Sequence, residues 1–281
     1  MSKLQGKVAV VTGAARSQGR SHAINLARQG ADVVVCDISG QIDSAPYALS
    51  SAEDLAETVR LVEQEDRRCV GITADVRDSA AVDGVFERAV EEFGRVDVAV
   101  SNAAIFAAEK LVDMSDDQWN DVMDVNATGS FHTVRAAARP MIEQGEGGRI
   151  ICISSTAGRQ GMDHFGNYTA SKWAVLGLMK TASMELAPHS ITVNAVCPGA
   201  TKTNLIFENK RVYELFCPDK ENPTTADVEE VILRDLHKLP VPWIEPQDIS
   251  NAVVFLASEE ARYVTGLALD VNCGLSSTWA A

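Results

Sequence analysis

Short apolar runs alternate with longer amphipathic segments along the whole chain. The apolar runs are rich in valine and isoleucine and cover residues 7–11, 32–36, 69–73, 96–100, 149–153, 191–196 and 267–271. Unbroken β-branched runs are typical of strands in a parallel sheet that is buried on both faces. Helical patterns lie between them, at residues 18–29, 52–65, 80–93, 116–143, 168–187 and 246–257. This alternation predicts an α/β fold: a doubly wound, Rossmann-like parallel seven-stranded sheet with helices on both faces.

Neither a linker nor an internal repeat divides the sequence, so residues 1–281 are predicted to form one domain. Two segments are longer than ordinary loops, which are usually short in compact domains. Residues 38–50 follow the second predicted strand, and residues 201–242 follow the sixth. The later segment contains a helical pattern at residues 226–239 and could form a lid over a substrate pocket.

Charge and composition exclude several classes of protein. The chain has 25 basic and 39 acidic residues, for a net charge of −14, so nucleic acids and anionic membranes are poor partners. It contains no apolar run long enough to span a membrane. The first residues lack the apolar stretch of a signal peptide, which predicts a cytoplasmic protein. The six cysteines form no C-x-x-C pair, and Cys36, Cys152 and Cys197 are expected to be buried free thiols without a metal.

A glycine-containing turn connects the first strand to the first helix. Gly13 and Gly19 would let the backbone approach a pyrophosphate, and the helix N-terminus would supply N–H donors. The alternative is a tight connection that binds no ligand. Asp37 ends the second strand, where a carboxylate can accept both hydroxyls of an adenosine ribose, which favours NAD over NADP. Arg16 argues the other way, because a cation in this turn could bind a 2′-phosphate.

Tyr168 and Lys172 lie one helical turn apart and therefore on one helix face. A lysine cation there should lower the pKa of the phenol. A phenol so tuned can exchange a proton with a substrate hydroxyl or carbonyl oxygen. A pair of this kind is also common on helix surfaces. Ser155 favours the catalytic interpretation, because it follows the fifth strand and the carboxyl ends of parallel strands face the ligand crevice.

These motifs, in this order, resemble the short-chain dehydrogenase/reductase family over nearly the whole chain. The family's glycine turn corresponds to residues 12–19, with Ser17 in place of the middle glycine. Its Asp-Val pair corresponds to Asp75 and Val76, and its Asn-Asn-Ala-Gly segment corresponds to residues 101–104, altered at both ends. Its Pro-Gly turn corresponds to Pro198 and Gly199. Residues 13–23 and 36–42 narrow the resemblance to the carveol dehydrogenase branch.

The resemblance implies an NAD-dependent oxidoreductase that interconverts a small apolar secondary alcohol, such as a cyclic terpenoid, and its ketone. Tyr168 would be the general acid–base, and Ser155 would bind the substrate oxygen. Lys172 would hold the nicotinamide ribose, and Asn126 would fix a water in a proton relay. We expect the cofactor to contact Gly13, Arg16, Ser17, Gln18, Gly19, Asp37, Ile38, Asp75, Val76, Asn102, Ala103, Tyr168, Lys172, Pro198, Gly199, Thr201 and Thr203.

The resemblance also implies partners. Family members are commonly homotetramers, and members of this branch are commonly coupled to mycofactocin and hold NAD tightly, which implies an external electron acceptor that re-oxidises bound NADH. The apolar segment 38–50 could fold over the nucleotide or pack on a neighbouring subunit. Trp243 and Trp279 are candidates for interface burial or for core packing. Two other functions stay open: an NADPH-dependent ketoreductase of acyl-carrier substrates, and a non-catalytic regulator that senses NAD.

Overall fold

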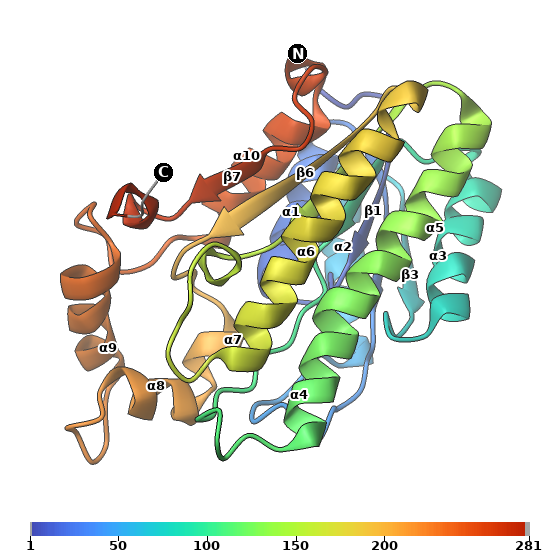
Figure 1. Cartoon of the computed structure of the whole chain (residues 1–281). Coiled ribbons are helices and arrows are strands. Elements are labelled where there is room, and N and C mark those ends of the chain that lie inside the picture. The colour runs from blue at the N-terminus through green and yellow to red at the C-terminus, as the bar shows by residue number, and fades with distance from the viewer. Residues whose placement is uncertain (1, 279–281) are drawn as a thin grey trace.

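All seven predicted strands form one parallel sheet in the computed structural model, which describes residues 2–278 (Figure 1). The expectation for Trp279 lies outside the described residues. The strand order is β3-β2-β1-β4-β5-β6-β7. The bounds are Val8–Thr12 for β1, Asp32–Asp37 for β2, Cys69–Thr73 for β3, Val98–Ser101 for β4, Gly148–Ile153 for β5, Ile191–Pro198 for β6 and Ala268–Val271 for β7.

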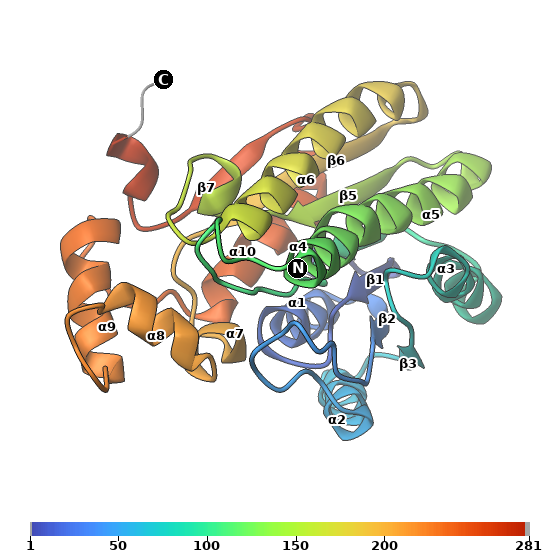
Figure 2. The same cartoon turned by 60° about the horizontal axis from the view of Figure 1, so that its bottom comes forward.

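Helices cover both faces of the sheet (Figure 2). Helices α1 (Ser17–Arg28), α2 (Ala52–Glu63) and α10 (Pro246–Ala257) pack on one face, and α3 (Ser79–Phe93), α5 (Gly129–Gln144) and α6 (Gly166–Glu185) pack on the other. Side chains alternate along each strand: Val10 contributes to the α3 side, whereas Ala9 and Val11 contribute to the α1 side. Fully burying an aliphatic side chain contributes about 1.5–3 kcal/mol, so both layers stabilise the sheet. The predicted fold class is confirmed.

The direction of strand addition reverses at β1. Val10 is in register with Val34 of β2 on one side and with Ala99 of β4 on the other. From β1 the chain first extends the sheet through β2 and β3, and then returns to extend it through β4 to β7. The loops after β1 and β4 therefore diverge and leave a crevice at the carboxyl ends of these strands.

The segment predicted as one helix at residues 116–143 is divided by a π turn. Helix α4 (Asp116–Met123) leads into the π turn Asp124–Thr128, and α5 begins at Gly129. Gly129 is needed there, because a Cβ atom would lie 2.6 Å from Cγ2 of Val76. Asn126 lies inside the turn and is fully buried. Single π turns inside helices are frequent at functional sites, and periodicity alone does not reveal them.

The predicted lid segment contains three short helices instead of one. They are α7 (Asn204–Phe207), α8 (Lys210–Phe216) and α9 (Thr225–Val231), and a second π turn, Ile232–Leu236, follows α9. They gather beyond the carboxyl end of β6 (Figure 1). Trp243 anchors them: its ring lies 4.7 Å from that of Phe207, and its Nε1–H donates to Glu229 at 2.7 Å. In this chain Trp243 is therefore a core residue of the lid.

The segment 38–50 has neither a helix nor a strand, yet it is closely held by the side chain of Gln41. The Gln41 Nε2 atom donates to the carbonyl oxygens of Ile42, Ala45 and Tyr47 at 3.1–3.2 Å. Its Oε1 accepts the Leu49 N–H at 3.0 Å. One side-chain amide thus replaces the regular backbone pairing that the loop lacks. We call this segment the insertion.

All six cysteines are free, and Cys36, Cys152 and Cys197 are buried, as predicted. Within residues 2–278 no helix is both long and apolar enough to cross a membrane. In the same range, no three His, Cys, Asp or Glu side chains are grouped to hold a metal ion.

His22 makes the stability of the protein depend on pH. Its imidazole is fully buried in α1, with Nδ1 2.8 Å from Oγ of Ser250 in α10, and burial lowers its pKa to about 3. Below pH 6.5 the unfolded chain binds a proton that the folded protein excludes. Stability present above pH 6.5 is therefore lost as the pH falls towards 3, by about 1.4 kcal/mol per pH unit.

We predict that His22→Asn, whose amide can still reach Ser250, removes this dependence. Between pH 6.5 and 4.5 the parent should lose about 2–3 kcal/mol more unfolding free energy than the variant. Urea unfolding of both proteins at the two pH values measures the difference. Equal losses would show that His22 does not cause the effect.

Candidate active site

A single cleft at the carboxyl ends of the strands brings together all the residues predicted to contact the cofactor. It is lined by Gly13, Arg16, Ser17, Gln18, Gly19, Asp37, Ile38, Asp75, Val76, Asn102, Ala103, Tyr168, Lys172, Pro198, Gly199, Thr201 and Thr203, together with Ser155. Asn126 is the one predicted site residue that does not line it. The residues come from the carboxyl ends of the strands, from the loops that follow them and from the N-terminal turns of α1 and α6. They are far apart in the sequence and are brought together by the parallel sheet.

The turn after β1 packs tightly against the segment after β4. Gly13 has a φ of +63°, and a Cβ atom there would lie 2.6 Å from Cα of Ala103. A Cβ atom on Gly19 would lie 2.0 Å from the carbonyl oxygen of Gly13. The amide of Asn102 donates to the carbonyl oxygens of Thr12 and Gly13, both at 2.9 Å. Both glycines are therefore required, and Asn102 holds the turn in place.

The N-terminus of α1 opens into this cleft with free hydrogen-bonding capacity. Among the described residues, no side chain caps the helix, and its first turn contains no acidic residue. Gln18 Oε1 is also buried without a hydrogen-bond partner among the described residues. Uncapped N–H groups and the positive end of the helix dipole favour an anion. The site therefore fits the pyrophosphate of a dinucleotide.

Arg16 and Ser17 connect the turn to the insertion and to the lid. Arg16 donates from Nη2 to the carbonyl oxygen of Ala48 at 2.6 Å, and its Nη1 lies 3.9 Å from Glu208. Ser17 has a φ of +49°, and its Oγ donates to Oδ1 of Asn204 at 2.9 Å and accepts the Asn204 N–H at 3.3 Å. The Arg16 guanidinium, considered as a partner for a 2′-phosphate, is thus engaged by the protein itself.

Asp37 lies at the end of β2, as predicted, and its carboxylate already accepts several hydrogen bonds. Oδ2 accepts the Ala15 N–H at 2.9 Å, and Oδ1 accepts the Ile38 N–H at 2.9 Å and the hydroxyl of Ser50. Ser50 is the last residue of the insertion, so Asp37 holds both ends of that segment. These hydrogen bonds hold the carboxylate in place at the end of β2, and its negative charge would repel a 2′-phosphate.

Tyr168 and Lys172 lie near the start of α6 and face the cleft with Ser155. Lys172 Nζ donates to the carbonyl oxygen of Ile153 at 2.9 Å and lies 5.5 Å from the centroid of the Tyr168 ring. Burial of the ammonium lowers the pKa of Lys172 to about 8. The hydroxyl of Tyr168 hydrogen-bonds Ser155.

The pKa of Tyr168 differs from the sequence-based expectation. Burial raises it to about 12, and the hydrogen bond from Ser155 opposes the rise without cancelling it. A low pKa was expected from the charge of Lys172, but Lys172 directs its Nζ to a backbone carbonyl and is itself buried. Desolvation of the phenolate therefore outweighs the attraction of the lysine.

Asn126 supports the cleft from behind. Its Oδ1 accepts the Ile105 N–H at 2.9 Å, and its Nδ2 donates to the Ile105 carbonyl oxygen and to Ser171 Oγ, both at 3.0 Å. The Ser171 hydroxyl in turn donates to the carbonyl oxygen of Tyr168 at 2.7 Å. The side chain thus joins the segment after β4 to helix α6.

Comparison with known proteins agrees with this geometry. Residues 7–212 match the short chain dehydrogenase family. The chain belongs to this family. It is 42% identical to (-)-trans-carveol dehydrogenase of Rhodococcus erythropolis over 275 residues, which cover 98% of the chain and 99% of the relative. The predicted resemblance to the family and to carveol dehydrogenases is confirmed.

Two solved structures of the family are also similar. Carveol dehydrogenase from Mycobacterium avium in complex with NAD has a TM-score of 0.96 and 44% identity, covering 99% of this chain and 100% of that chain. A short chain dehydrogenase from Mycobacterium paratuberculosis bound to NAD has a TM-score of 0.88 and 40% identity, covering 98% and 99%.

Several residues that line the cleft of this short chain dehydrogenase were not among the predicted contacts. Four come from the insertion and three from the lid, namely Ile42, Tyr47, Leu49, Ser50, Asn204, Leu205 and Ile206. Others are Ala74, Ala104, Ile105, Val125, Ile153 and Ser154, which adjoin predicted positions. The apolar composition of the insertion was the available signal. It indicated that the segment lies near the site, but not which side chains reach it.

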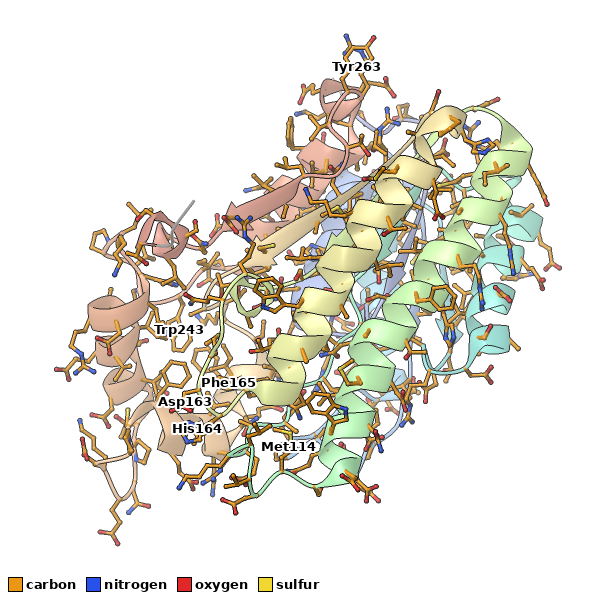
Figure 3. All side chains as sticks on the ribbon, viewed as in Figure 1. Met114, Asp163, His164, Phe165, Trp243 and Tyr263 are labelled. Atoms are coloured by element: carbon orange, nitrogen blue, oxygen red, sulfur yellow. The ribbon has the colours of Figure 1, made fainter. Side chains whose placement is uncertain are left out.

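An apolar cluster adjoins the Tyr168 end of the cleft. Tyr47 from the insertion, Phe106 after β4, Phe165 before α6 and Val212 from α8 are buried together there. The Phe106 ring lies edge-on to the Tyr168 ring, with centroids 5.0 Å apart and an interplanar angle of 84°. Figure 3 shows Phe165 and His164 at the N-terminal end of α6, on the same side of the molecule as Trp243 of the lid.

Proposed function

We propose that this short chain dehydrogenase interconverts a small apolar secondary alcohol and its ketone, with NAD as the hydride carrier. The observation that carries the proposal is that Ser155, Tyr168 and Lys172 face the same cleft as the glycine turn and Asp37. The similarity to a carveol dehydrogenase and to two structures determined with NAD supports it.

The residues present fit NAD. The N-terminus of α1 offers uncapped N–H groups to the pyrophosphate. Asp37 offers carboxylate oxygens to the adenosine ribose, and Lys172 lies at the other end of the cleft beside Tyr168. NAD bound there would supply the hydride acceptor at its nicotinamide.

The three polar side chains have distinct tasks at the substrate oxygen. In ketone reduction Tyr168, which is protonated at neutral pH, donates its proton to the carbonyl oxygen and becomes a phenolate. In alcohol oxidation the step runs in reverse, and the phenolate form of Tyr168 receives the hydroxyl proton. With a pKa of about 8, Lys172 is mostly charged at pH 7, and this charge stabilises the phenolate that forms. Ser155 hydrogen-bonds Tyr168 and orients the substrate oxygen beside it.

The cluster around Phe106 favours an apolar substrate. Its aromatic and aliphatic side chains lie next to Tyr168, so an alcohol in reach of the catalytic hydroxyl must place its carbon skeleton against them. A polar or charged skeleton would lose its hydration there without gaining hydrogen bonds. A cyclic terpenoid alcohol such as carveol has the required character.

Tyr168→Phe tests the chemistry, because it removes only the hydroxyl. We expect the variant to bind NAD while hydride transfer falls by about 10²–10⁴, the usual contribution of a general acid–base. Single-turnover formation of NADH at 340 nm, a wavelength at which only the reduced cofactor absorbs, measures the rate for a panel of secondary alcohols. Near-normal rates would exclude Tyr168 as the acid–base. A parent that binds NAD but oxidises no alcohol would favour the NAD-sensing alternative.

Asp37→Ala tests the choice of cofactor. Loss of the carboxylate removes the repulsion of a 2′-phosphate, so we expect the preference for NAD over NADP to fall by at least about tenfold, as for the loss of about 1.4 kcal/mol. Equilibrium binding of both nucleotides to cofactor-depleted parent and variant is the measurement. A parent that binds NADP as tightly as NAD would contradict the assignment and favour an NADPH-dependent ketoreductase.

We also propose that NAD leaves the cleft slowly and that an external electron acceptor re-oxidises the bound NADH. Arg16 and Ser17 tie the insertion to one side of the phosphate-binding turn and the lid to the other. Both segments contribute lining residues, so both cover the cleft. Each 1.4 kcal/mol by which these segments stabilise the NAD-bound state tightens NAD binding about tenfold, mostly through slower release.

Slow release has a direct test. The purified protein should release close to one NAD per chain when denatured. It should reduce that NAD on addition of substrate, and turn over repeatedly only with an artificial electron acceptor. Nucleotide in the denatured extract is quantified by chromatography. Cofactor-free protein with rapid steady-state turnover on added NAD would instead show an ordinary exchanging enzyme.

We further propose that the protein assembles as a homotetramer. Large apolar side chains are exposed on three helices: Trp119 of α4, Phe131 of α5 and Trp173 of α6 have exposed fractions of 38%, 43% and 52%. Helix α6 packs against both α4 and α5, and association with other copies would remove these side chains from water.

A further inference from the structure

We propose that Tyr47 is a positioning residue that sets the selectivity of the substrate pocket through Phe106. The inference rests on the proposed function and extends it, because it gives the insertion a task at the substrate end of the cleft. The insertion begins at the carboxyl end of β2 beside Asp37, but its Tyr47 lines the cleft together with Tyr168.

Tyr47 makes a specific contact with the backbone after β4. Its side chain is buried, with 8% exposed, and its hydroxyl oxygen accepts the Phe106 N–H at 3.1 Å. Burial raises the pKa of Tyr47, so the hydroxyl stays neutral across the working pH range. The Gln41 amide holds the carbonyl oxygen of Tyr47 at 3.1 Å, which fixes the backbone that presents the phenol.

Tyr47 and Asn126 hold two consecutive backbone N–H groups. Asn126 accepts from Ile105 at 2.9 Å and Tyr47 accepts from Phe106 at 3.1 Å. Neither N–H belongs to a strand, because β4 ends at Ser101, so side chains must satisfy them. Asn126 joins this segment to the catalytic helix, and Tyr47 joins it to the insertion.

The ring of Phe106 transmits this position to the reacting end of the cleft. It lies 5.0 Å from the Tyr168 ring at an interplanar angle of 84°, and 4.8 Å from the Phe165 ring. The backbone atoms of Phe106 fix where its ring can lie. A shift of that backbone therefore moves the apolar wall beside Tyr168 and leaves Ser155, Tyr168 and Lys172 in place.

The expected consequence depends on the size of the substrate. Removing the Tyr47 hydroxyl leaves the buried Phe106 N–H without its acceptor, and such groups are costly to leave unpaired. The segment must shift to recover a partner. A bulky cyclic alcohol that packs against Phe106 then binds more weakly, whereas a small acyclic alcohol that needs only the catalytic groups does not.

Tyr47→Phe in the NAD-loaded protein is the decisive variant, with Tyr263→Phe as the matched control. Tyr263 is 88% exposed and lies at the opposite end of the molecule (Figure 3). For carveol, Tyr47→Phe should raise KM by roughly tenfold, as expected for one lost hydrogen bond, and change kcat less than about threefold. For 2-butanol both constants should stay within about twofold, and Tyr263→Phe should match the parent for both alcohols. The NAD content should equal that of the parent.

A second variant shows whether Tyr47 acts through Phe106. Phe106→Leu removes the aromatic wall, so adding Tyr47→Phe to it should raise KM for carveol by much less than tenfold. Hydrogen exchange of the Phe106 amide in the parent and in Tyr47→Phe provides a readout without turnover. We expect exchange to be at least about tenfold faster in the variant, as for the loss of one hydrogen bond.

The outcomes separate this inference from the proposed function. Four results would each overturn the role of Tyr47 while the parent remains an active dehydrogenase. They are an unchanged KM for carveol, equal effects on both alcohols, fully additive effects of the two substitutions, and unchanged exchange of the Phe106 amide. Loss of NAD as the only effect would make Tyr47 a cofactor residue and also overturn it. A parent that oxidises neither alcohol refutes the proposed function, and the selectivity role falls with it.

Discussion

The active cleft depends on the requirement that a parallel sheet bury both of its faces. Strand β1 is buried throughout and pairs with β2 on one side and β4 on the other. Helices must therefore cross over between consecutive strands, and every strand ends at the same edge. Gly13, Asp37 and Ser155 come from three different loops, yet the sheet delivers all three to one cleft.

The same requirement explains which features could be predicted from the sequence. Buried strands need continuous β-branched runs, so β1, β2 and β5 were predicted to within one residue at each end. Phosphate-binding turns need glycine where a Cβ atom has no space, so Gly13 and Gly19 could be recognised. The family resemblance added positions such as Thr201 that no local pattern marks. Together, the local patterns and the family resemblance identified cofactor contacts that all line the cleft.

The remaining features depend on contacts between distant segments, which leave little periodic signal. The π turn at Asn126 precedes Gly129, which lies close to Val76 in the segment after β3. The pKa of Tyr168 was predicted from its neighbour in the sequence, whereas burial by the surrounding fold determines it. The insertion is organised by the Gln41 amide and carries no hydrogen-bonded ladder. The lid helices are too short for a clear apolar period, so only α9 was anticipated.

Ser17 shows how these distant contacts can stabilise a locally unfavourable conformation. At a φ of +49° it occupies the left-handed region, where a residue with a Cβ atom costs roughly 1–2 kcal/mol relative to the right-handed one. Its hydroxyl makes two hydrogen bonds with Asn204, each contributing about 0.5–1.5 kcal/mol. The two effects are of similar size and nearly cancel. A glycine there would relieve the strain and would also remove the contact with Asn204, which leaves Arg16 and Glu208 as the remaining link between the turn and the lid. The serine therefore links the conformation of the lid to that of the turn through a single side chain.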